Sequence, residues 1–155
     1  MTEVWFFHLE RQTLEAMLPQ LVEKTLAKGW RAVIKAGSDE RAEAISSALW
    51  MHGESGFLPH GTKQDGRGAE QPVWITGDDD RPNGPQALFL VDGAETADIT
   101  GLERIVRVFD GNVEESLTTA RAAWKAAKAD GHTVSYWQQD ERSRWINKAA
   151  KEAAA

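Results

Sequence analysis

The sequence predicts a single α/β domain with a mainly parallel sheet and helices on its faces. Short apolar segments alternate with longer segments whose apolar residues recur every three or four positions, the pattern of strands alternating with amphipathic helices. The chain has 155 residues and 41% hydrophobic content, enough for one core of ordinary size. We expect the domain to span residues 1–139 and a polar tail to span residues 140–155.

The first strand and helix are predicted by apolar periodicity. Residues 4–9 are an apolar, aromatic run typical of a strand buried on both faces. Residues 13–28 carry apolar side chains at helical spacing, and Gly29 is a stop signal. Pro19 lies inside this pattern and should kink the helix or shift its start, because proline lacks the amide donor.

A second strand and helix follow. Residues 30–36 predict a strand, and Ser38 predicts the N-cap of a helix that ends near Met51. Residues 57–60 predict a short extended piece. Residues 61–71 are polar and rich in glycine, which predicts a mobile loop.

The second half of the chain predicts more strands and one long helix. Asn112 and Glu115 have the spacing of a capping box at the start of that helix, and Gly131 marks its end. Residues 133–137 have strand character, whereas residues 138–155 predict a frayed or weakly helical tail. Three further strands are predicted before that helix, at residues 73–76, 87–91 and 104–109. Residues 77–85 predict a turn between the first two of them.

Composition excludes several classes of protein. The formal net charge of -6 and the pI near 5.2 disfavour direct binding to nucleic acid, which depends on Lys and Arg at the phosphates. No apolar run approaches the roughly 20 residues that span a bilayer. The amino terminus lacks the features of a secretory signal, and the absence of cysteine excludes disulfides. We expect a cytoplasmic protein without a membrane segment.

The sequence lacks the usual motifs of nucleotide-binding proteins. Neither a phosphate-binding loop of the G-x-x-x-x-G-K-[ST] type nor a G-x-G-x-x-G motif occurs. Asp92 ends an apolar strand as a magnesium-binding aspartate does, but that role requires the missing loop. The consecutive residues Asp78, Asp79 and Asp80 point in different directions and lack the spacing of a calcium loop, so they predict a solvated turn.

Other catalytic constellations are absent as well. The four histidines, His8, His52, His60 and His132, form no metal-binding helical pair, which favours structural or surface roles. There is no cysteine nucleophile and no serine in a G-x-S-x-G elbow. We expect no catalytic residue, no metal and no cofactor.

A basic, aromatic stripe stands out on the last long helix. Arg121, Trp124, Lys125 and Lys128 occur at i, i+3, i+4 and i+7, so they project from one face, and we call them the basic stripe. The neighbouring face is apolar and is expected to dock on the sheet; it comprises Val113, Leu117, Ala120, Ala123 and Ala127.

Two interpretations fit the basic stripe. In the first, the cations complement the helix dipole, as Glu114 and Glu115 do in the first turn, and Trp124 belongs to the core. In the second, the stripe is a receptor for an acidic, apolar peptide: the cations hold carboxylates, and the indole is a wall for an apolar side chain. Spacing alone does not choose between them.

Several blocks of the sequence carry a more specific signal than composition or periodicity. One runs from Arg121 to Lys125 and leads to Gly131 and His132. The more specific blocks are Ala48-Leu49-Trp50, Glu54-Ser55-Gly56-Phe57-Leu58-Pro59-His60 and Gln71-Pro72-Val73-Trp74-Ile75. Together these blocks resemble the chi subunit family of bacterial DNA polymerase III, and the resemblance covers the chain to about Gln139.

The resemblance implies a three-layer α/β/α sandwich, similar to a mononucleotide-binding domain without a phosphate loop. It also implies a non-catalytic adaptor that binds the acidic C-terminal tail of single-stranded-DNA-binding protein through Arg121, Trp124 and Lys125, with Lys128 nearby. Trp124 stands where the best-known members carry Tyr, which keeps an aromatic wall but loses the hydroxyl.

The same resemblance implies a second partner. The psi subunit would join the adaptor to the clamp loader, so that contact with DNA is only indirect. The candidate psi-facing residues are Trp50, Phe57, Pro59 and His60, although burial of Trp50 and Phe57 in the core would explain them equally well. Two alternatives to the adaptor are a nucleotide-binding α/β enzyme and a module that binds single-stranded DNA directly.

Overall fold

Most of the chain is described by a computed structural model, which covers residues 2–10, 12–51, 60–96, 98–142 and 144–147. Its strands are β1 (Glu3–Leu9), β2 (Ala32–Lys35), β3 (Gly61–Thr62), β4 (Val73–Thr76), β5 (Ala87–Leu90), β6 (Arg104–Asp110), β7 (Thr133–Gln139) and β8 (Trp145–Asn147). Its helices are α1 (Leu14–Ala27), α2 (Asp39–Met51) and α3 (Glu114–Ala129), with a short 3-10 helix at Gly68–Glu70.

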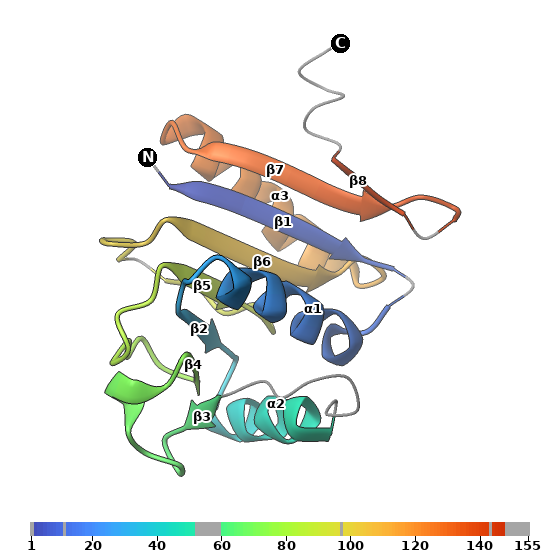
Figure 1. Cartoon of the computed structure of the whole chain (residues 1–155). Coiled ribbons are helices and arrows are strands. Elements are labelled where there is room, and N and C mark those ends of the chain that lie inside the picture. Colours follow the sequence, from blue (N-terminus) through green and yellow to red (C-terminus); the bar gives the residue numbers. More distant parts are fainter. Residues whose placement is uncertain (1, 11, 52–59, 97, 143, 148–155) are drawn as a thin grey trace.

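All eight of these strands form one sheet in the order β3-β4-β2-β5-β6-β1-β7-β8. Every neighbouring pair is parallel except β7 and β8, which are antiparallel. Helices α1 and α2 lie on one face of the sheet and α3 lies on the other (Figure 1). The predicted α/β class, its mainly parallel sheet and its three layers are confirmed.

The interior strand β1 explains how both faces of the sheet acquire a core. Phe7 and Leu9 pack with α1 and α2, whereas Val4 and Phe6 pack with α3. This division follows from the period of two in an extended strand. The predicted strand at residues 4–9, buried on both faces, is therefore confirmed, and Phe6 is fully buried.

Helix starts were predicted with mixed success. Ser38 caps α2 as expected, because its Oγ accepts a hydrogen bond from the Arg41 N–H at 3.1 Å. Helix α1 begins at Leu14 and continues through Pro19, so the proline does not shift its start. The capping box at Asn112 was wrong: the N-cap of α3 is Val113, and the Asn112 side chain donates to the Glu10 carbonyl oxygen at 3.0 Å.

Two segments are more ordered than their composition indicated. Within the predicted loop at residues 61–71, Gly61 and Thr62 pair with β4, and the Asp65 carboxylate accepts the Thr62 N–H at 2.9 Å. The prediction of a frayed or weakly helical tail was wrong at its start, because β7 extends to Gln139 and β8 pairs with it. Residues 148–155 lie outside the described residues, as do Phe57 and Pro59.

Gly77 is required by a close approach between the end of β4 and the start of α2. A Cβ at this position would overlap the Ser38 carbonyl carbon and lie 2.5 Å from the Asp39 nitrogen. Backbone atoms cannot move aside as a flexible side chain can. We expect Gly77→Ala to lower the free energy of unfolding by about 1–3 kcal/mol in urea denaturation. Ser47→Ala, at an exposed position of α2, is the matched control; equal effects of the two changes would contradict this explanation.

Candidate functional site

Helix α3 docks on the sheet through small side chains. Ala120 and Ala127 are buried at 5% and 8% exposure and pack against Val4 and Phe6 of β1. Val113, predicted to belong to this docking face, is instead 44% exposed, because it is the extended N-cap residue rather than part of the helix. The docking face therefore fixes which side of α3 remains accessible.

The basic stripe lies on that accessible side. Arg121, Lys125 and Lys128 are exposed, and Trp124 is half-buried. The Lys128 Nζ lies 5.5 Å from the centroid of the Trp124 ring, within the range of a cation–π interaction. The structure thus places the four predicted residues on one face of α3, with Lys128 beside the indole.

The three cations of the basic stripe take part in none of the ion pairs found among the described residues. In contrast, many other basic side chains of this acidic protein are paired with carboxylates: Lys35, Arg41, Lys63, Arg67, Arg104, Arg107 and Arg144. Exposed cations without an internal counterion are available to the carboxylates of a partner.

The contacts also support the first interpretation of the basic stripe, in which Trp124 belongs to the core and the cations complement the helix dipole. Trp124 packs edge-on against Phe6, with ring centroids 5.5 Å apart, so the indole belongs in part to the core. Glu114 and Glu115 lie in the first turn of α3 and Lys128 in the last, as the helix dipole favours. Both roles are compatible, because one part of the indole can anchor the helix while the rest remains exposed.

Sequence reasoning missed the aromatic residues that support Trp124. Tyr136 of β7 meets the indole edge-on at 5.7 Å, and Phe109 of β6 lies 6.0 Å from the Tyr136 ring. Alternation along the strands assigns Phe6 and Tyr136 each to one face of its own strand. It does not reveal that β1 and β7 are neighbours or that α3 covers them.

The psi-facing candidates are described only in part. His60 is 4% exposed, and its Nε2 lies 3.1 Å from the Ser46 carbonyl oxygen of α2. That contact favours a structural role for His60. Phe57 and Pro59 fall outside the described residues, as does the side chain of Trp50, so the psi-facing surface stays a prediction.

A crevice of about 1000 Å³ opens at the carboxyl ends of β1, β5 and β6, where open α/β sheets commonly bind ligands. Arg41 is bound to Asp92 through hydrogen bonds of 2.9 and 3.1 Å, and Arg107 is bound to Glu95. The carboxylates that line the crevice are Glu10, Glu15, Asp92, Asp110 and Glu115. A phosphate group would meet excess negative charge there, which disfavours the nucleotide-binding alternative.

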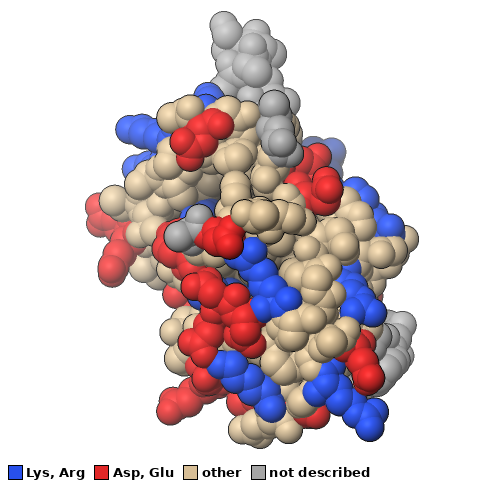
Figure 2. Space-filling model, turned by 90° about the vertical axis from the view of Figure 1, so that its left-hand side faces the viewer, with Lys and Arg blue, Asp and Glu red and all other residues tan. Residues whose placement is uncertain are grey.

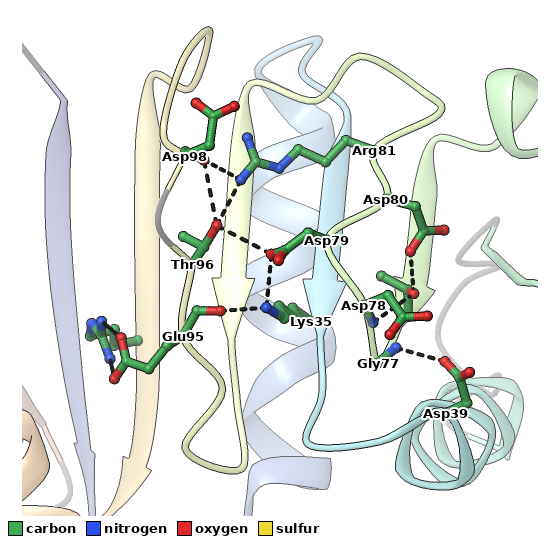
Figure 3. A network of polar contacts seen from close by, with 12 residues as sticks. Lys35, Asp39, Gly77, Asp78, Asp79, Asp80, Arg81, Glu95, Thr96 and Asp98 are labelled. Carbon is green, nitrogen blue, oxygen red and sulfur yellow. Dashed lines mark hydrogen bonds and ion pairs between the residues drawn. The ribbon is translucent and has the colours of Figure 1, made fainter.

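The three consecutive aspartates point in different directions, as the sequence indicated (Figure 3). Asp78 pairs with Lys63, Asp79 accepts from Lys35 Nζ at 2.8 Å, and Asp80 accepts from the Trp74 indole N–H at 2.7 Å. The hydrogen bond from Lys35 lowers the pKa of Asp79. This network ties the turn after β4 to the loop after β5, since Arg81 also donates to Thr96 at 2.9 Å.

Charge is mixed on the face of the molecule seen in Figure 2. The face shown in Figure 2 carries acidic and basic side chains side by side, without a continuous basic area. No group of three or more His, Asp or Glu side chains suited to a metal ion occurs among the described residues. Within the same residues, no helix combines the length and apolarity that crossing a bilayer requires.

Together these features define an α/β domain with an acidic crevice at the carboxyl edge of its sheet and three exposed cations on one face of α3. Residues 1–135 match the family model of the DNA polymerase III chi subunit, HolC, and the chain belongs to this family. It is also similar to the probable DNA polymerase III subunit chi of Rickettsia prowazekii (strain Madrid E), with 26% identity over 109 residues. That match covers 70% of this chain and 66% of the relative, just under two thirds of the relative's length.

Proposed function

We propose that this chain is a non-catalytic accessory subunit of DNA polymerase III that binds the acidic C-terminal tail of single-stranded-DNA-binding protein through the basic stripe. In this role it links the tail, through a psi subunit, to the clamp loader, and it meets DNA only indirectly. The observation that carries the proposal is the group of three exposed cations, in no ion pair among the described residues, on the same helix face as the half-buried indole of Trp124. Membership in the chi family supports the same role.

The chemistry of the stripe fits such a tail. Arg121 can hold a carboxylate through two parallel hydrogen bonds, and the ammonium groups of Lys125 and Lys128 add charge on the same face. An apolar side chain of the tail can pack on the indole of Trp124. The combination selects a peptide that is both acidic and apolar, rather than a bare phosphate backbone.

The direct test is a titration with a labelled peptide ending in Asp-Asp-Ile-Pro-Phe, followed by fluorescence anisotropy. We expect saturable binding that weakens severalfold from low to moderate salt, because exposed charges are screened over roughly 8–10 Å at physiological ionic strength. A peptide with both aspartates replaced by asparagine is the control and should bind much more weakly.

A labelled single-stranded oligonucleotide provides the contrasting measurement. We expect no salt-sensitive binding of naked DNA, since the net charge of the chain is -6. Binding of the oligonucleotide without binding of the peptide would overturn the proposal in favour of direct DNA recognition.

A further inference from the structure

Tyr136 connects the indole of the basic stripe to a histidine of strand β1. Its ring meets Trp124 edge-on at 5.7 Å and stacks with Phe6 at 6.2 Å. Its hydroxyl oxygen lies 2.8 Å from His8 Nδ1. One side chain of β7 therefore touches both the candidate site and the interior of the sheet.

The His8 imidazole is held from several sides. It is 7% exposed, and its ring lies 5.2 Å from Phe109. Its Nε2 is 3.0 Å from the Glu10 carboxylate, close enough for an electrostatic contact although outside hydrogen-bond geometry. A Cβ at Gly111 would overlap Nε2, so the imidazole occupies space that any other residue at 111 would fill. A neutral imidazole with its proton on Nε2 accepts the Tyr136 O–H at Nδ1.

We propose that His8 and Tyr136 are positioning residues of the peptide site: their hydrogen bond fixes the Tyr136 ring, and that ring holds the Trp124 indole in place beside Arg121. The inference rests on the proposed function and adds to it a support that lies outside α3. Without the hydroxyl contact, the Tyr136 ring loses one of the contacts that position it, so its edge-on contact with the indole is less firmly fixed.

The charges around His8 give this arrangement a measurable signature. Burial is the main cause that lowers the pKa of His8, and the positive charge of Arg121 lowers it further, whereas Glu10 and Asp110 raise it. A peptide carboxylate bound at Arg121 would offset that charge and so raise the His8 pKa. By linkage, peptide binding strengthens as pH falls through the range where His8 titrates.

The free protein responds to pH in the opposite sense. The folded pKa of His8 lies below its ordinary value of about 6.5, so the unfolded chain binds the proton more readily. The stability that the neutral imidazole contributes is present above pH ~6.5 and is lost as pH falls through the lowered pKa. Circular dichroism at each pH therefore confirms that the protein titrated with peptide is folded.

Tyr136→Phe tests the hydrogen bond, because it removes the hydroxyl and keeps the ring. We expect peptide affinity to fall about three- to tenfold, the range that follows from losing one hydrogen bond. Ser135→Ala, the adjacent position on the other face of β7, is the matched control and should leave affinity unchanged. In the wild-type protein, NMR titration of the His8 imidazole should show a higher midpoint when peptide is bound.

The outcomes separate the two proposals. Failure of the wild-type protein to bind the peptide overturns the proposed function, and this inference falls with it. If the wild-type protein binds but Tyr136→Phe binds equally well, or if peptide leaves the His8 midpoint unchanged, the positioning role alone is wrong. The NMR measurement needs no variant, so an unchanged His8 midpoint still contradicts the proposal if Tyr136→Phe does not fold.

Discussion

Reversing the charge of Arg121 in the variant Arg121→Glu should weaken binding of the acidic peptide by about 100-fold or more. A hydrogen bond to a charged group contributes about 1.5–3 kcal/mol, and each 1.4 kcal/mol is a factor of ten in affinity. The introduced carboxylate adds repulsion. Because Arg121 is exposed and takes part in no ion pair among the described residues, unfolding free energy should change by less than about 0.5 kcal/mol. Anisotropy titrations and urea denaturation measure the two quantities.

Lys24→Glu is the matched control for this change. Lys24 is exposed in the last turn of α1, on the opposite face of the sheet, and the substitution changes net charge by the same two units, from -6 to -8. We expect it to alter affinity by less than about twofold, since charges more than a Debye length away are largely screened. Equal losses in the two variants would show that overall charge, rather than a site on α3, attracts the peptide.

Truncating Phe6 should produce the largest loss of stability. Phe6 has no exposed surface, and its ring contacts Trp124 and Tyr136. Replacing a buried Phe by Ala costs about 3–5 kcal/mol through lost burial and the cavity left behind. For a chain of this size, that corresponds to a fall in Tm of roughly 6–20 °C. Thermal and urea unfolding of Phe6→Ala measure the effect directly.

The same variant should also weaken peptide binding, because the indole of Trp124 loses the ring against which it packs. Val113→Ala provides the contrast: Val113 is 44% exposed, and we expect a change within about 0.5 kcal/mol. A loss below about 1 kcal/mol in Phe6→Ala would mean that β1 and α3 do not pack as described.

The class of fold could be predicted from the sequence because its strands and helices differ in apolar period. The position of β1 between β6 and β7 could not be predicted, because strands that pair but lie far apart in the chain leave no local signal in the sequence. Local signals also failed where tertiary contacts competed with them. Asn112 has the right spacing for a helix cap, but its side-chain amide donates a hydrogen bond to the Glu10 carbonyl oxygen instead.

The short strand β8 was missed for a related reason. Its three residues are too few to show a period of two, and its pairing depends on the turn that precedes it. In that turn, the Asp140 carboxylate accepts the N–H groups of Arg142 and Arg144, both at 2.9 Å. These hydrogen bonds orient the chain for an antiparallel return beside β7.

The candidate site, like the fold, could be predicted from the sequence only in part. The four residues of the basic stripe share one helix, so spacing alone brought them together. Their aromatic support comes from Phe6 and Tyr136, which belong to strands at opposite ends of the described chain. No helical or strand pattern within either segment indicates that both rings meet Trp124.

The place of β1 between β6 and β7 also governs when the sheet can close during synthesis. Glu3 and Arg104, paired across β1 and β6, are 101 residues apart. At translation rates of about 5–20 residues per second, β1 waits roughly 5–20 seconds before its first neighbour exists, and longer before β7 emerges. Through that interval the N–H and C=O groups along its edges have no strand to pair with. The nascent chain therefore presents Val4 to Leu9 to the chaperones that recognise exposed apolar segments before it presents a folded domain.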